Sequence, residues 1–117
     1  GVSLEGAPGK PQRFAWNTIV GNKSTGLVCA AASLPTKGLL VSGNVPSDNL
    51  VCTLDDSSRI ATGGDAKLDV NNRLQAGSVC IDRVAPVAGE GPYDDIDGDL
   101  RPVGAKLDCG ADEWKMP

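Results

Sequence analysis

Residues 26–29 read Gly-Leu-Val-Cys and residues 49–52 read Asn-Leu-Val-Cys, so the same short apolar strand signal returns 23 residues later. Gly-Asn pairs at 21–22 and 43–44 return at nearly the same interval, and each follows a short apolar run. The repeating unit is therefore a strand, a Gly-Asn turn, a loop and a second strand. Repeats of this length with such short strands predict parallel β-structure in which successive units stack on one another.

The composition agrees with short strands rather than helices. Gly and Pro together make 15 + 8 = 23 of the 117 residues, which interrupts the sequence too often for long helices. We therefore expect an all-β fold, a short parallel β-helix of about three to four coils, with a small β-sandwich as the alternative. In this interpretation residues 1–13 are a leading segment, residues 14–117 are a single domain, and residues from about 84 to 117 are its modified C-terminal cap.

The chain has four cysteines, Cys29, Cys52, Cys80 and Cys109. An even number in a small Gly-rich chain favours disulfides and an oxidising, extracellular or cell-surface location, with free buried thiols as the alternative. A zinc site fits poorly, because zinc ligands usually pair two to four residues apart. The nearest cysteines here are 23 residues apart, and histidine is absent.

The spacing also bears on which cysteines pair. Equivalent residues on stacked strands lie about 4.8 Å apart, and disulfides accept Cα separations of about 4.4–6.8 Å. Cysteines one coil apart are thus placed to bond, which favours Cys29–Cys52 with Cys80–Cys109 as the second bridge. The competing pair Cys52–Cys80 leaves two cysteines that are 80 residues apart, which makes it the poorer choice.

Charge and hydropathy argue against several functions. The net charge of −4 disfavours nucleic acid as a partner, because nucleic acid attracts clustered Lys and Arg. No run approaches the ~20 apolar residues of a membrane-spanning helix. Since histidine is absent, the usual Ser-His and Cys-His nucleophile arrangements are excluded, and we expect no enzymatic activity.

An acidic segment at residues 94–99 is a candidate site. Its aspartates alternate around a glycine, and we expect a turn held by Asx-type hydrogen bonds, with Asp97 in a structural ion pair with Arg101. One alternative is a structural Ca²⁺ site on the carboxylates of Asp95, Asp97 and Asp99. The other is a solvated acidic loop. The spacing is not that of an EF-hand, and we expect no other cofactor.

Two further aspartates, Asp82 and Asp108, lie beside apolar residues close to cysteines. We expect them to cap backbone N–H groups at tight turns, or to pair with Arg83 or Arg101, rather than to form a catalytic pair. The remaining Lys and Arg residues are scattered, so no basic constellation of the kind used by polysaccharide lyases is evident within the chain.

Four segments resemble a known family. The C-terminal third reads LQAGSVCID at residues 74–82, DIDGDLRP at 95–102 and LDCGADE at 107–113, and residues 17–22 read NTIVGN. This series closely resembles the ending of bacterial secreted right-handed parallel β-helix proteins of the choice-of-anchor and polymorphic outer-membrane type. The resemblance covers roughly residues 15–114. It departs at residues 53–73, which lack the usual DPLF-like segment, and at Arg83, where glycine is common.

The resemblance implies a secreted or surface-displayed protein whose β-helix ends within this chain. We expect a non-catalytic, adhesin-like structural and interaction domain, with carbohydrate binding or processing as the alternative. Trp16 and Trp114 are expected to close the ends of the apolar stack or to serve as platforms for a sugar. The expected partners are upstream coils or a second copy at an open N-terminal edge near residues 14–20, or a glycan or surface protein. Residues 1–13 are the other means of covering that edge.

Overall fold

The computed structural model describes residues 1–4, 14–29, 36–62, 64–89 and 91–116. Within these ranges the chain forms eight strands and no helix, which confirms the all-β expectation. Accordingly, no helix in the described part of the chain is long and apolar enough to cross a membrane.

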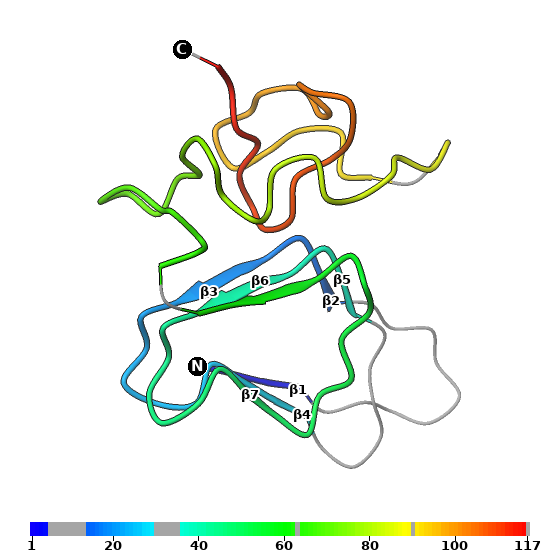
Figure 1. Ribbon diagram of the computed structural model, residues 1–117. Coiled ribbons are helices and arrows are strands. Elements are labelled where there is room, and N and C mark those ends of the chain that lie inside the picture. The colour runs from blue at the N-terminus through cyan, green and yellow to red at the C-terminus, as the bar shows by residue number, and fades with distance from the viewer. Residues whose placement is uncertain (5–13, 30–35, 63, 90, 117) are drawn as a thin grey trace.

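The strands form three small sheets, in the orders β1-β4-β7, β2-β5 and β3-β6-β8 (Figure 1). Their bounds are β1 Val2–Leu4, β2 Phe14–Ala15, β3 Thr18–Val20, β4 Leu27–Cys29, β5 Thr36–Lys37, β6 Leu40–Ser42, β7 Asn49–Leu50 and β8 Arg59–Ala61. We call β1, β2 and β3 the first layer, β4, β5 and β6 the second layer, and β7 and β8 the third layer. The three layers together are the strand stack.

The pairing between layers is parallel in every sheet, and its register repeats with the period read from the sequence. Thr18 lies opposite Leu40 and Phe14 lies opposite Thr36, in both cases 22 residues further along the chain. Parallel pairing of this kind disfavours the β-sandwich alternative, whose sheets are antiparallel.

The first strand changes one expectation. Val2–Leu4 form β1, with Val2 opposite Leu27, so these residues belong to the strand stack rather than to a leading segment. They pair with β4 and not with β2 or β3, and therefore do not cover the edge near residues 14–20. The rest of the proposed leading segment, residues 5–13, lies outside the described residues.

The Gly-Asn turns connect the layers through asparagine side chains. Asn44 Oδ1 accepts bonds from the backbone N–H and from Nδ2 of Asn22, at 3.0 and 2.7 Å, and its Nδ2 donates to the Ile19 carbonyl at 3.0 Å. Asn44 is buried, so these bonds satisfy polar atoms that would otherwise destabilise the fold. Gly21 and Gly43 precede the two asparagines with φ of 65° and 66°, a region that favours glycine.

Two apolar clusters lie on the two faces of the β3-β6-β8 sheet. The inner cluster, enclosed by the three sheets, contains Ile19, Leu27, Cys29, Leu39, Val41 and Cys52. The outer cluster contains Leu40, Ala61, Ala66, Leu74, Cys80 and Cys109. Because side chains alternate along a strand, Leu40 points away from the inner cluster, yet it is fully buried. Its burial, worth roughly 1.5–3 kcal/mol, requires that the C-terminal half of the chain cover this face.

That covering unit, which we call the cap, comprises residues 64–89 and 91–116 and lies along the outer face of the β3-β6-β8 sheet (Figure 1). Its described residues form no strand and pair only at isolated antiparallel bridges, which are Leu68–Leu74, Val84–Leu107 and Asp94–Leu100. The segments around Cys80 and Cys109 are therefore not further coils, so three to four coils is too many, and the cap begins well before residue 84. Asp, Gly and Pro recur too often here for strands, because they favour turns.

The cap is fixed to the strand stack by backbone contacts at one turn. The Gly110 N–H donates to the Gly38 carbonyl at 2.6 Å, and the Ala111 N–H donates to Thr18 Oγ1 at 3.0 Å. Gly110 has a φ of 92°, and a Cβ there would clash with Thr18 and crowd Leu40. Only glycine therefore allows the cap to approach the sheet this closely.

Both disulfides favoured by the sequence are present. Cys29–Cys52 joins the second and third layers with a Cα–Cα distance of 4.9 Å, in keeping with the spacing of stacked strands. Cys80–Cys109 has a similar Cα–Cα distance of 4.8 Å, but it lies within the cap and joins two turns rather than two strands. Two disulfides fit an oxidising location.

Candidate functional site

The cap is built around two loops with the same hydrogen bonds, residues 69–73 and 95–99, which we call the twin loops. In the first, Asp69 Oδ1 accepts the N–H groups of the residues two and four positions later, at 2.8 and 2.9 Å. In the second, Asp95 Oδ1 accepts the two corresponding N–H groups, both at 2.9 Å. Each loop has a residue with positive φ at its fourth position, Asn72 or Gly98. The expected Asx-type turn in the acidic segment is confirmed.

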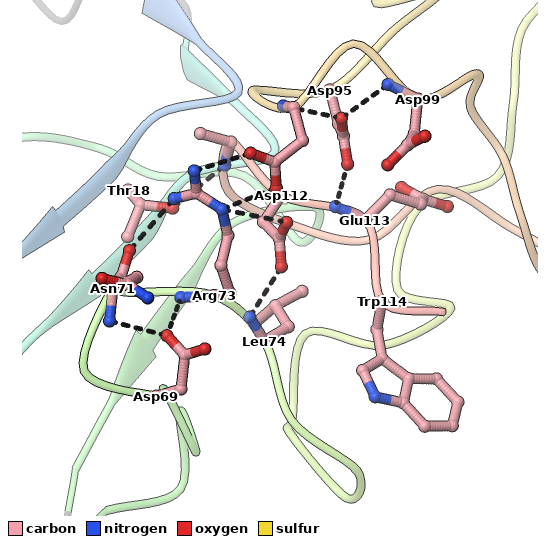
Figure 2. Close-up of polar contacts among 12 residues, drawn as sticks. Thr18, Asp69, Asn71, Arg73, Leu74, Asp95, Asp99, Asp112, Glu113 and Trp114 are labelled. Atoms are coloured by element: carbon pink, nitrogen blue, oxygen red, sulfur yellow. Dashed lines mark hydrogen bonds and ion pairs between the residues drawn. The ribbon is translucent and has the colours of Figure 1, made fainter. Parts of the chain in front are cut away.

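Arg73 joins the twin loops (Figure 2). Its Nε and Nη2 donate to the two carboxylate oxygens of Asp97 at 2.7 and 2.8 Å, and its Nε lies 3.8 Å from Asp112 Oδ1. The hydrogen bond from Arg73 holds the pKa of the Asp97 carboxyl below its usual value. Burial, by contrast, raises the pKa of Asp112, against the effect of the Leu74 N–H that it accepts at 2.6 Å.

The carboxylates that converge are not the expected set. Oxygens of Asp95, Asp97 and Asp112 lie within 4.8 Å of one another, whereas Asp99 forms an ion pair with Lys115. The guanidinium of Arg73 already supplies positive charge at this cluster. A Ca²⁺ ion would find oxygen ligands of suitable chemistry here, but it would have to compete with that guanidinium.

The expected ion pair between Asp97 and Arg101 is wrong. Asp97 binds Arg73, and Arg101 instead donates through Nε to Glu113 Oε2 at 2.8 Å. Both side chains of the Arg101–Glu113 pair are 1% exposed. The remaining Arg101 donors bind the Asp108 and Gly110 carbonyls at 2.6 and 3.3 Å, so the buried charge is both paired and hydrogen-bonded.

The role expected of Asp82 and Asp108, capping of backbone N–H groups, is confirmed. The two Asp108 oxygens accept the N–H groups of Asp82 and Trp114, at 2.6 and 2.7 Å, and Asp82 Oδ1 accepts the Lys106 N–H at 2.7 Å. Burial raises the pKa of Asp108 to about 6, although the two backbone N–H groups act in the opposite direction. Its carboxyl therefore takes up a proton on mild acidification.

The two tryptophans differ in their surroundings. The Arg101 guanidinium carbon lies 5.1 Å from the centre of a Trp16 ring, and a Cβ on Gly38 would clash with the same side chain. Trp16 thus connects the strand stack with the cap, which occupies part of its surface. Trp114 packs partly against the outer apolar cluster and lines an open cleft of about 390 Å³ beside Arg73 and Asp97.

The two ends of the strand stack form the other candidate site, because edge strands expose backbone groups that can pair with another chain. The N-terminal edge is the first layer, β1, β2 and β3, whose residues carry no charged side chain. The C-terminal edge is the third layer together with β5, and it carries Lys37 and Arg59.

Side chains also close the C-terminal edge from within. The Gly38 and Leu39 N–H groups donate to the hydroxyls of Ser57 and Ser58, at 2.8 and 3.0 Å. Asn49 stands opposite Leu27 of the preceding layer, so an amide replaces a buried leucine at the end of the stack. Its Nδ2 donates to the Cys52 carbonyl at 2.8 Å, while its buried Oδ1 has no partner in the described part of the chain.

Sequence reasoning missed the twin loops and with them Arg73, Asp112 and Glu113. A signal was present, because Asp69–Leu74 and Asp95–Leu100 both read Asp, apolar, Asn or Asp, Asn or Gly, charged, Leu. This second internal repeat lies 26 residues apart and was hidden by the search for strand repeats.

Comparisons with models of protein families, with curated proteins and with solved structures find no match to this chain.

Proposed function

We propose that the chain is a non-catalytic structural and interaction module, the closing end of a right-handed parallel β-helix in a secreted, adhesin-like surface protein. The repeated 22-residue register of the parallel strands supports the β-helix. The disulfide between the second and third layers and the disulfide inside the cap suit an extracellular protein.

The observation that carries the proposal is the difference between the two ends of the strand stack. At the C-terminal edge, Asn49 and Ser58 occupy positions that Leu27 and Leu39 hold one layer earlier. The Asn49 Oδ1 is buried without a partner, which destabilises a fold by about 1–3 kcal/mol. A polar residue that weakens the fold, placed where another layer would stack, is a device that prevents further pairing.

The N-terminal edge lacks such devices. Ile19 is 5% exposed there, and Val2 and Phe14 pack partly against the inner cluster, so the interior of the first layer is apolar. No charged side chain stands on its strands. A stack that is closed at one end and open at the other is what a terminal module requires, because its open end receives the preceding coils.

We expect Ser58→Ala to open the closed end locally. The Leu39 N–H loses its acceptor in a buried position, which lowers the free energy of unfolding by about 1–3 kcal/mol. Hydrogen exchange followed by NMR should show a faster Leu39 amide, while the Leu40 amide, which donates to the Asn17 carbonyl, stays slow. Ser3→Ala, at an exposed position of the N-terminal edge, is the control and should change neither. An unchanged Leu39 amide in Ser58→Ala would contradict the closure.

A further inference from the structure

The N-terminal edge offers backbone pairing on all three sides of the stack. β1, β2 and β3 are each the outermost strand of their sheet. Their residues are Val-Ser-Leu, Phe-Ala and Thr-Ile-Val, with no Lys, Glu, Asp or Pro to hinder pairing. Natural proteins usually protect exposed edges with such residues, so an unprotected edge marks a surface that is covered in the working protein.

The contrast with the next layer is visible at single positions. Ala15 stands opposite Lys37, and Leu40 of the second layer stands opposite Arg59 of the third. A charge thus appears where the chain approaches the C-terminal edge and is missing at the N-terminal edge. Ile60, whose neighbour one layer earlier is the fully buried Val41, is 42% exposed at the C-terminal edge.

This asymmetry determines how two copies can meet. A head-to-tail contact would place the N-terminal edge of one copy on the C-terminal edge of another, which is charged and closed by Ser57 and Ser58. The remaining way to cover the N-terminal edge with the same chain is head to head. Such a contact uses the same surface on both copies, has two-fold symmetry and ends at two chains.

We infer that, when no coil precedes it, the chain forms a head-to-head dimer through β1, β2 and β3. The inference rests on the proposed function, because it uses the same open edge. Across the two-fold axis the paired edge strands run antiparallel, and the apolar residues Val2, Phe14 and Ile19 of the two copies face one another. The dimer is finite, since neither copy leaves a second open edge.

Sedimentation velocity and light scattering over a wide range of concentration test this inference. The wild-type chain should reach twice the 12.0 kDa mass of one copy. Val2→Lys places a charge at the interface and should leave only monomer. Ala15→Lys, which copies the lysine found one layer later and leaves the inner cluster intact, should do the same if Val2→Lys disturbs folding. Ile60→Lys, at the matched inward position of the opposite edge, should stay dimeric.

The other outcomes overturn the inference in distinguishable ways. A wild-type chain that stays monomeric at every concentration removes the dimer but leaves the proposed terminal module standing. A dimer that Ile60→Lys dissociates and Val2→Lys does not would place association at the C-terminal edge and overturn both. Growth into long polymers would also contradict both, because it requires two open edges.

Discussion

Arg101→Met lowers the free energy of unfolding by about 3–5 kcal/mol, the usual effect of removing one partner from a buried ion pair. The change leaves the Glu113 carboxylate without its counter-ion at a site where both side chains are 1% exposed. It also removes donors to the Asp108 and Gly110 carbonyls and the cation–π contact with Trp16. Because total stability is about 5–15 kcal/mol for a domain, this single change should unfold much of the cap.

Urea denaturation followed by fluorescence measures the effect, and Arg73→Met supplies a matched control. Arg73 also binds a carboxylate of the cap through two hydrogen bonds, but its pair with Asp97 is exposed. Exposed pairs contribute little, so the control should change the midpoint only slightly. Equal losses for the two variants would contradict the importance given to the buried pair.

The double replacement Cys80→Ala and Cys109→Ala should have the second large effect. The bridge closes a loop of 29 residues, which in the chain-entropy model stabilises the fold by about 3–4 kcal/mol. Both cysteines are completely buried beside Leu40, so loss of the sulfur atoms also leaves a cavity between the cap and the sheet.

The measurement is the urea midpoint of this variant with and without a reducing agent. The variant should unfold at much lower urea than the wild-type chain. Reduction should lower its midpoint further, because Cys29–Cys52 still joins the second and third layers. A variant with wild-type stability would show that turns and hydrogen bonds alone hold the cap.

The strand stack was largely predictable from the sequence, because its signals are local and repeat. Gly-Asn pairs and short aliphatic runs returned at one interval, and the structure places Asn22 against Asn44 at that interval. The Cys29–Cys52 bridge follows from the same register. Physical constraints on neighbouring parallel strands thus appear in the sequence as a period.

The cap was predicted less well, because its contacts depend on turns whose relative placement no period encodes. Arg101 was assigned to the nearest aspartates in sequence, whereas its partner Glu113 is brought close by the fold of the whole cap. Leu40 was read as one of several strand residues, and nothing in its surroundings indicated that a second layer of structure covers it. The resemblance to β-helix endings contained these residues without indicating their partners.

The central claim is that the strand stack is open at its N-terminal edge and accepts another layer there. A copy of residues 14–25 added directly before Gly1 tests it, because Val2 lies opposite Leu27 and the copy then precedes β1 as the original precedes β4. We measure thermal unfolding and amide exchange of this extended chain against one with a scrambled extension of equal composition. The account predicts a midpoint several degrees higher and slower exchange in β2 and β3 for the copy alone. Identical midpoints and exchange rates for the two extended chains would contradict it.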